Sequence, residues 1–465
     1  MKSREIKNLG IPSGEPVKAA LEGVAEARQR GIDVRDIRER VRRLAADPLA
    51  FRDDPHFGAL ARLLSERAAA RSSFVPRILD APFRQWGTDL DPASVQQLEN
   101  ACKLPVAVRG ALMPDAHRGY GLPIGGVLAT RGAVIPYAVG VDIACRMKMT
   151  VLDLPPDTLR GQPDRLAKAI EVETRFGVGA SFERRRGHDV MDEDWDVSPV
   201  TRRNRDKAWS QLGTSGSGNH FVEFGVFEVD HGDLGLVPGT YLALLSHSGS
   251  RGTGASVADH YSQLAMRRHP ELPKELTHLA WLDLDQEAGQ EYWAAMDLMG
   301  KYAAANHACI HRHVAKHLGA DVLLDLENHH NFAWKEEHDG EVVIVHRKGA
   351  TPAGEGVLGI IPGSMASPTY VVRGKGSAAS LRSAAHGAGR VMSRTQAKKS
   401  FVWSTVNKYL KEKGVTVLSA GLDEVPGVYK DIDDVMAAQR DLVEPVARFQ
   451  PKLVKMAPAG ERPED

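Results

Sequence analysis

The feature that most constrains the fold of this chain is a change in sequence texture near residue 80. Beyond it glycine is frequent, and short β-type runs, such as 241–247 and 340–347, alternate with helical stretches such as 284–319. This alternation is typical of a mixed body of strands and helices around a shared core. We therefore expect residues 81–465 to form an α+β catalytic domain, in which mixed sheets are surrounded by helices.

The residues before this change have the pattern of helices. Apolar Val17, Leu21 and Val24 recur between charged residues, and Gly31 suits a helix C-terminus. A second segment, rich in arginine and glutamate, ends before Pro48. We expect residues 1–80 to form an N-terminal helical accessory region. An arginine surface that faces nucleic acid is the alternative.

Composition gives few indications of the partners. The chain has 465 residues, and its 60 basic and 60 acidic side chains cancel, so the net charge indicates neither a nucleic-acid nor a membrane partner. Three scattered cysteines do not suit a disulfide framework and fit a reducing compartment. Without a signal peptide or a run of about 20 apolar residues, we expect a cytoplasmic protein with no membrane contact.

The densest chemical feature lies at residues 138–147. An apolar run there brings Asp142 and Cys145 to within three residues of each other. A carboxylate and a thiolate can share a borderline divalent ion such as Zn, Mn or Co. A single buried cysteine is also a common core residue, so this segment alone leaves both interpretations open.

Histidines elsewhere favour the metal. Residues His220, His247, His329 with His330, and His386 each lie where a regular run meets a turn, most of them glycine-rich. One such histidine is usually a hydrogen-bonded core residue, but four junctions that all carry histidine point to a site built from distant loops. Zinc-finger and H-E-x-x-H spacings are absent from the sequence, so a small structural zinc module is disfavoured.

The same glycine-rich turns can approach an anion through backbone N–H groups, because they have no Cβ atoms. They match neither the Walker A motif nor the dinucleotide fingerprint. Each turn taken alone can be only a turn. Beside candidate metal ligands, they favour a phosphorylated substrate whose charge a metal would neutralise.

Seven motifs in order, VGVDIACRM, GSGNHFVEF, HSGSRGTG, HHN, VHRKGAT, IPGSM and HGAGRVMSR, resemble those of the RtcB family of RNA ligases. The resemblance runs from about residue 85 nearly to the C-terminus. It implies an RtcB-like fold with a metal site in a central cleft. It also implies an enzyme that uses GTP and two Mn²⁺ ions to join RNA 3′-phosphate or 2′,3′-cyclic phosphate ends to 5′-hydroxyl ends.

The resemblance also implies roles for individual residues. His386 becomes the nucleophile that accepts GMP, and Cys145 bridges two manganese ions. Asp142 and His220 complete one coordination shell, and His247 and His330 the other; His330 is favoured over His329 because asparagine follows it. The implied nucleotide contacts are Asn219, His220, Phe221, Val222, Glu223, His330, Asn331, Pro362, Gly363, Ser364, Met365, Thr369, His386, Gly387, Ala388, Gly389 and Lys455.

The chain departs from the family pattern near the proposed metals. Ala144 and Arg146 stand where the family usually has glycine, the loop after Thr351 is short, and Ala385 replaces a frequent cysteine. We expect Arg146 to place bulk and charge beside the metals, where it alters substrate fit or binds a phosphate. None of these changes removes a ligand or the nucleophile.

Three functions remain in competition. The first is the GTP-dependent RNA ligase, in RNA repair or tRNA splicing. The second is a binuclear metallo-phosphoesterase on nucleic-acid phosphate ends, which would not need His386. The third is a diverged RNA-binding repair paralogue, which the complete ligand set disfavours. The sequence does not identify the RNA substrate or show whether an activating protein partner is required.

Overall fold

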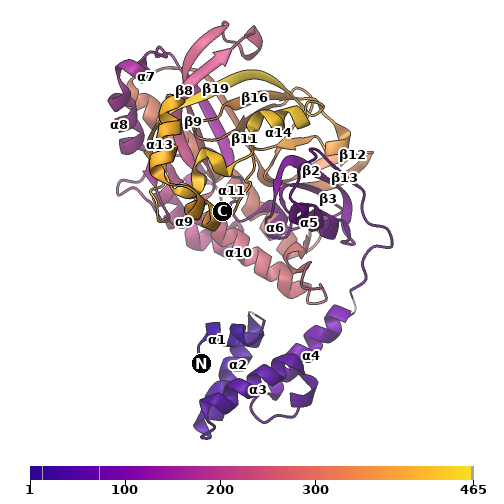
Figure 1. The fold of residues 1–465 in the computed structure, drawn as a ribbon. Coiled ribbons are helices and arrows are strands. Elements are labelled where there is room, and N and C mark those ends of the chain that lie inside the picture. Colours follow the sequence, from indigo (N-terminus) through magenta and orange to yellow (C-terminus); the bar gives the residue numbers. More distant parts are fainter. Residues whose placement is uncertain (13, 73, 462–465) are drawn as a thin grey trace. The chain divides into compact units, whose positions relative to one another are not determined.

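The computed structural model describes residues 1–12, 14–72 and 74–461, and the chain divides into two compact units. One unit consists of residues 1–75 and 267–277, and the other of residues 76–266 and 278–465. Figure 1 shows the ribbon of both. The functional division that we expect at residue 80 stays a prediction.

The smaller unit is helical, as its sequence pattern predicts. In α3 the buried residues Ile37, Val41 and Leu44 share one face, and the Asp33 side chain caps the helix by accepting the Arg35 N–H at 2.8 Å. A Cβ on Gly23 would lie 2.5 Å from the His56 carbonyl oxygen, so this close approach needs glycine. The helices are α1 (Ser3–Asn8), α2 (Glu15–Gln29), α3 (Val34–Ala46) and α4 (Gly58–Ser72).

The larger unit contains two main sheets with helices around them, which confirms the predicted α+β class. The eight-stranded sheet has the order β11-β5-β9-β8-β19-β16-β15, with β18 paired to β19. Its strands are β5 (Arg146–Leu152), β8 (Phe221–Val229), β9 (Gly239–Ser248), β11 (Val322–His329), β15 (Leu358–Pro362), β16 (Thr369–Gly374), β18 (Thr416–Ser419) and β19 (Val443–Met456).

The five-stranded sheet has the order β1-β2-β3-β13-β12. Short pairs of strands link the two sheets, among them β14 (Ala350–Pro352) with β17 (Ser383–Ala385). The strands of the smaller sheet are β1 (Phe83–Gln85), β2 (Ala107–His117), β3 (Ile124–Thr130), β12 (Asn331–His338) and β13 (Glu341–Lys348). Surrounding helices include α5 (Pro92–Cys102), α8 (Pro163–Glu173), α9 (Pro199–Gln211), α10 (Arg251–Arg268), α11 (Glu287–Leu318), α12 (Arg394–Ser400), α13 (Trp403–Glu412) and α14 (Ile432–Ala438).

Strand alternation gives the eight-stranded sheet two distinct faces. Leu242 and Leu244 of β9 pack with Ile310 of α11 in one core, whereas Ala243 and Leu245 belong to a second core on the opposite face. The same alternation continues to the end of β9. It places Ser246 on the face covered by α11 and His247 on the other, which we call the ligand face.

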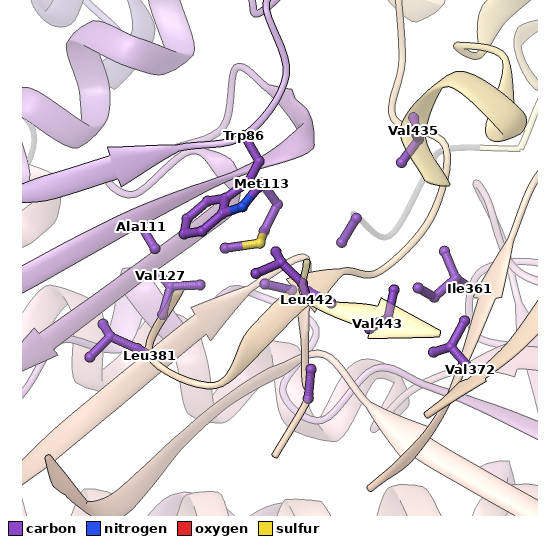
Figure 2. Packing of buried hydrophobic residues seen from close by; sticks show 14 of the residues in the cluster. Trp86, Ala111, Met113, Val127, Ile361, Val372, Leu381, Val435, Leu442 and Val443 are labelled. Atoms are coloured by element: carbon purple, nitrogen blue, oxygen red, sulfur yellow. The ribbon is translucent and has the colours of Figure 1, made fainter. Parts of the chain in front are cut away.

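A further core joins the two sheets and packs beside the segments that carry Asp115 and His386. Trp86, Met113 and Val127 pack there with Val372 and Val443 (Figure 2). Met113 precedes Asp115 by two residues, and Ala385 of the same core directly precedes His386. This packing brings together segments some 270 residues apart in the chain. Among the residues that the structure describes, no helix combines the length and the apolar character needed to cross a bilayer.

Candidate metal centre and active site

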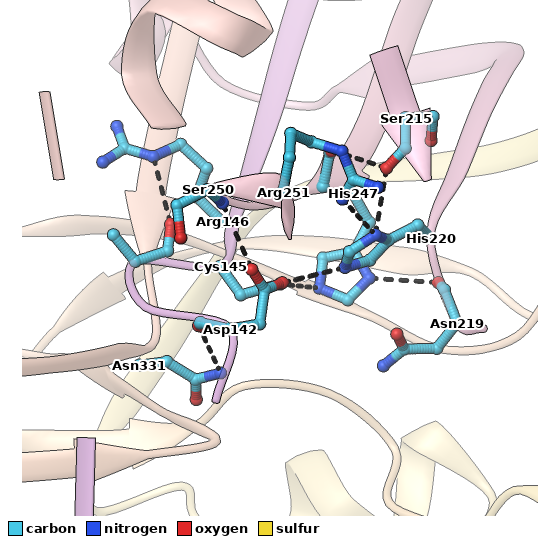
Figure 3. Close-up of polar contacts among 12 residues, drawn as sticks. Asp142, Cys145, Arg146, Ser215, Asn219, His220, His247, Ser250, Arg251 and Asn331 are labelled. Atoms are coloured by element: carbon cyan, nitrogen blue, oxygen red, sulfur yellow. Dashed lines mark hydrogen bonds and ion pairs between the residues drawn. The ribbon is translucent and has the colours of Figure 1, made fainter. Parts of the chain in front are cut away.

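Five side chains that can bind a metal converge at the edge of the ligand face. Cys145, His247 and His330 form one group, and Asp142, Cys145 and His220 form another; within each group the potential ligand atoms lie within 4.8 Å of one another. Cys145 belongs to both groups. The sequence places these residues in four separate segments, and the fold unites them. Figure 3 shows Asp142, Cys145, His220 and His247 together.

The turn that carries Asp142 and Cys145 has a left-handed residue, Ala144, with φ of +57°. Such a conformation costs a non-glycine residue about 1–2 kcal/mol, so its surroundings must hold it. The Ala144 N–H donates to the Asn331 carbonyl at 2.7 Å, and the His330 N–H donates to the Cys145 carbonyl at 3.0 Å. Backbone bonds therefore tie this turn to the segment of His330.

The histidines are oriented by backbone carbonyls. His247 Nδ1 lies 3.1 Å from the Asn219 carbonyl oxygen, which accepts its N–H and leaves the Nε2 lone pair facing the Cys145 sulfur at 3.1 Å. His220 Nε2 lies 3.0 Å from Asp142 Oδ2. Its Nδ1 lies 3.0 Å from the Ser215 carbonyl and 3.2 Å from an Arg251 nitrogen. If a cation binds Nε2 of His220, the ring proton lies on Nδ1. The Nδ1–H can then donate to the Ser215 carbonyl.

Burial and neighbouring charges set the protonation states of His247, His330 and Asp142. Burial lowers the pKa of His247 to about 3 and that of His330 well below its ordinary value. Burial alone would raise the pKa of Asp142, but the hydrogen bond and charge of His220, with Arg251, bring it below the ordinary value. At neutral pH the imidazoles of His247 and His330 are therefore neutral and the Asp142 carboxylate is charged, as metal coordination requires.

This donor set fits divalent metal. A thiolate shared between two groups, three imidazoles and a carboxylate suit borderline ions, and a bridging sulfur allows two of them. His330 Nδ1, Asn219 Oδ1 and Ser215 Oγ are buried without a hydrogen-bond partner among the described residues. Buried polar atoms in this state are uncommon. Here they belong to the candidate ligand His330 and to the two residues whose carbonyls contact His247 and His220.

His386 lies beside the metal-binding group. Its ring centroid is 4.8 Å from that of His330, and its Nδ1 lies 2.7 Å from Oδ2 of Asp115. The same carboxylate oxygen accepts the His386 and Gly387 backbone N–H groups at 3.2 Å each. Because an ionised carboxylate can only accept, His386 carries its proton on Nδ1, and its Nε2 lone pair is available as a nucleophile.

Comparison with known proteins shows the family of the chain. The family model of tRNA-splicing ligase RtcB matches residues 97–197 and 187–456. The chain belongs to the RtcB ligase family. The RNA-splicing ligase RtcB of Escherichia coli (strain K12) is 34% identical over 405 residues, covering 78% of this chain and 95% of that protein. The tRNA-splicing ligase RtcB of Nanoarchaeum equitans is 33% identical, with 81% and 95% covered.

Membership of the RtcB family confirms the resemblance seen in the ordered motifs. The tRNA-splicing ligase RtcB of Thermococcus kodakarensis, a third relative, is 29% identical and covers 77% of this chain. The matched region of the family model begins at residue 97, so residues 1–75 of the helical unit lie outside it, whereas residues 267–277 lie within it.

The residues expected to contact the nucleotide fall into two clusters in this RtcB chain. Phe221, Val222 and Glu223 begin β8, directly after Asn219 and His220, and Lys455 of β19 pairs with Val222. Burial raises the pKa of Glu223 well above its ordinary value. The Lys455 ammonium lies 3.3 Å from the Glu171 carboxylate, so it already has an acidic partner.

The second cluster lies where β15 passes to β16. Pro362 and Thr369 face each other across this hairpin, and Gly363, Ser364 and Met365 lie in its loop. A Cβ on Gly387 would lie 3.4 Å from the Pro362 carbonyl oxygen, so Gly387, Ala388 and Gly389 begin next to it. Met365 packs in the same core as Phe221, which connects the two clusters. Asn331 instead binds the ligand turn, donating to the Asp142 carbonyl at 3.1 Å.

Arg146 does not lie where we expect it from the sequence. Strand alternation turns its side chain to the face covered by α11, where it contacts Glu327 and the Gly300 carbonyl. Figure 3 shows the guanidinium pointing away from His220 and His247. The expectation of a cation beside the metals is therefore wrong for this structure.

The sequence interpretation missed Asp115, Ser250 and Arg251. Asp115 is fully buried near the end of β2, and the Ser250 N–H donates to Asp142 Oδ1 at 3.1 Å. The sequence signal that could have identified Asp115 is its position in a buried strand, because an unpaired carboxylate is rare there. Ser250 and Arg251 lie in the motif that also supplies His247.

Proposed function

We propose that this chain is an RNA ligase that joins RNA 3′-phosphate or 2′,3′-cyclic phosphate ends to 5′-hydroxyl ends, with GTP and Mn²⁺ as cofactors. The relatives in the RtcB family are named RNA-splicing or tRNA-splicing ligases. The observation that carries the proposal is the pairing of His386 with Asp115 next to a group of five candidate metal ligands.

The chain supplies a nucleophile for nucleotidyl transfer. Asp115 holds the proton of His386 on Nδ1, so that Nε2 can attack the α-phosphorus of GTP. A nitrogen–phosphorus bond forms, the bond between the α-phosphorus and its bridging oxygen to the β-phosphorus breaks, and pyrophosphate leaves. Asp115 stabilises the positive charge that develops on the imidazole.

The later steps return His386 to its starting state. An oxygen of the RNA 3′-phosphate attacks the phosphorus held by His386, and the nitrogen–phosphorus bond breaks. The 5′-hydroxyl then attacks the activated 3′-phosphorus, and GMP leaves with the electrons of the broken bond. A cyclic phosphate is first opened by water.

Asp142, Cys145, His220, His247 and His330 would hold two Mn²⁺ ions, and Cys145 belongs to both groups of candidate ligands. Bound divalent ions neutralise phosphate charge and orient the reacting oxygens. Asn219, Glu223, Lys455, residues 362–365, Thr369 and residues 387–389 form the proposed guanine-nucleotide site. The phosphoesterase alternative gives no role to the oriented His386, and for that reason we do not favour it.

A ligation assay tests this function. RNA with a 3′-phosphate or cyclic phosphate and a 5′-hydroxyl should be joined when GTP and Mn²⁺ are present. Omission of GTP or addition of EDTA should abolish joining, and RNA with 3′-hydroxyl and 5′-phosphate ends should remain unjoined. Release of phosphate without joining would indicate the phosphoesterase and contradict the proposal.

A further inference from the structure

Arg146 is a buried cation that the proposed chemistry does not use. It follows Cys145 directly and begins β5, and its side chain is only 5% exposed. A guanidinium remains charged even where burial lowers its pKa, as it does here. A charge in this position is costly unless it is well paired, so its partners indicate what it stabilises.

Each contact of the Arg146 guanidinium fixes a different segment. Nε lies 3.5 Å from the carbonyl oxygen of Ala144, the left-handed residue of the ligand turn. One terminal nitrogen lies 3.2 Å from Glu327 Oε1 on β11, three residues before His330. The other donates to the Gly300 carbonyl of α11 at 2.9 Å. One side chain thus joins the ligand turn, the strand that leads to His330 and the covering helix.

These contacts add to backbone bonds that already connect the same segments. Arg146 pairs with His329 in the ladder between β5 and β11, and the Cys145 carbonyl accepts the His330 N–H at 3.0 Å. The backbone bonds set the spacing of the two segments. The guanidinium, with its planar set of donors, limits how far one can slide or twist against the other.

We propose that Arg146 is a positioning residue that holds Cys145 and His330 at the separation needed to bind metal. The inference rests on the metal centre of the proposed function. Groups that orient metal ligands without touching the metal typically change its affinity 10- to 100-fold when they are removed. Arg146 acts through the ligand turn and β11, and its guanidinium lies on the face covered by α11.

Lys148 provides a matched control. It lies two residues further along β5 on the same face, is similarly buried, and forms ion pairs with Asp325 and, at 3.9 Å, with Glu327 of β11. Its loss removes a buried cation that joins the same two strands. It does not contact the ligand turn, however, so it separates loss of strand pairing from loss of ligand positioning.

The test titrates metal-free Arg146→Met, Arg146→Lys, Lys148→Met and wild-type protein with Mn²⁺ and with Co²⁺. The absorption of bound Co²⁺ reports thiolate ligation and coordination geometry. We expect Arg146→Met to bind Mn²⁺ at least tenfold more weakly, with altered Co²⁺ absorption. Arg146→Lys should be intermediate, because one ammonium cannot replace all three contacts. The Mn²⁺ affinity of Lys148→Met should stay within threefold of that of wild type.

Wild-type affinity and spectrum in both Arg146 variants would overturn the inference, as would an equal loss of affinity in Lys148→Met. If Arg146→Met does not fold, Arg146→Lys alone decides between these outcomes. Failure of the wild-type protein to bind either ion would instead refute the metal centre itself.

Discussion

His247 and His307 lie on opposite faces of the same sheet, and their surroundings differ in a way that separates function from structure. On the ligand face, His247 Nε2 faces Cys145, and neighbouring polar atoms such as His330 Nδ1 have no protein partner among the described residues. On the face covered by α11, His307 contacts the Ser248 carbonyl and the Ser246 hydroxyl, and His311 contacts Ser246 and Thr150.

Both sets of histidines are buried, so burial alone does not identify a site. The difference lies in hydrogen bonding: His307 and His311 have a protein partner for both ring nitrogens, whereas His330 Nδ1 has none among the described residues. Because unpaired buried polar groups are costly, they persist where a ligand pairs them.

The largest effect is expected for Asp115→Asn. An asparagine can donate an N–H to Nδ1 of His386, which would move the ring proton to Nε2 and remove the nucleophilic lone pair. The rate of covalent GMP transfer to the protein should fall about 10³-fold in single-turnover assays. Asp339→Asn, at an exposed carboxylate paired with Arg109, is the control and should retain the wild-type rate. A normal rate in Asp115→Asn would show that this carboxylate does not orient His386.

The adjacent residues His329 and His330 should differ in their effect on Mn²⁺ binding. His330→Ala should weaken Mn²⁺ binding at least 100-fold, because it removes a proposed ligand, while His329→Ala should change it less than tenfold. His329 packs beside Phe332 and Trp334 instead of facing the ligand group. Calorimetric titration of both variants measures this difference. Equal losses would place the metal elsewhere.

Substitution of His307 should lower the stability of the fold and leave Mn²⁺ affinity nearly unchanged. His307→Phe leaves the Ser246 hydroxyl and the Ser248 carbonyl short of a partner, and should lower the free energy of unfolding by about 3 kcal/mol. Mn²⁺ affinity should remain within tenfold of wild type. His313→Phe on the same helix is partly exposed, so it should cost little in urea unfolding. A His307 variant that loses metal binding but not stability would contradict the assignment of a structural role.

Acidification should destabilise the protein gradually. Burial lowers the pKa of His307 and His311 well below 6.5, and that of His346 to about 4. The unfolded chain takes up protons below pH 6.5 that the folded chain does not. Stability should therefore be fully present above pH 6.5 and fall below it, by up to about 1.4 kcal/mol per pH unit for each histidine. Urea unfolding of wild type and His307→Phe between pH 7 and 5 should give a shallower slope for the variant, and parallel slopes would contradict this account.

Much of the fold could be predicted from local pattern. The helical stretch expected at 284–319 is α11, Glu287–Leu318, and the run ending at His247 is β9. The glycine-flanked histidines and Cys145 also predicted that residues from distant segments lie close together, because turn residues and metal-binding side chains occur together in the sequence.

The remaining features depend on contacts that have no local signal. Both faces of β9 are apolar, so its sequence does not show that Ser246 and His247 face opposite sides or that Arg146 turns away from the metals. His307 and His311 look in the sequence like candidate ligands at helical spacing. Asp115 meets His386 only after two sheets have packed together.

The central claim is that His386 carries the covalent chemistry while the other histidines of the ligand face hold metal. It is tested most directly by incubating the protein with α-labelled GTP and Mn²⁺ and measuring protein-bound label. We expect wild type and His329→Ala to become labelled and His386→Ala to remain unlabelled. Full labelling of His386→Ala, or no labelling of metal-loaded wild type, would contradict the mechanism.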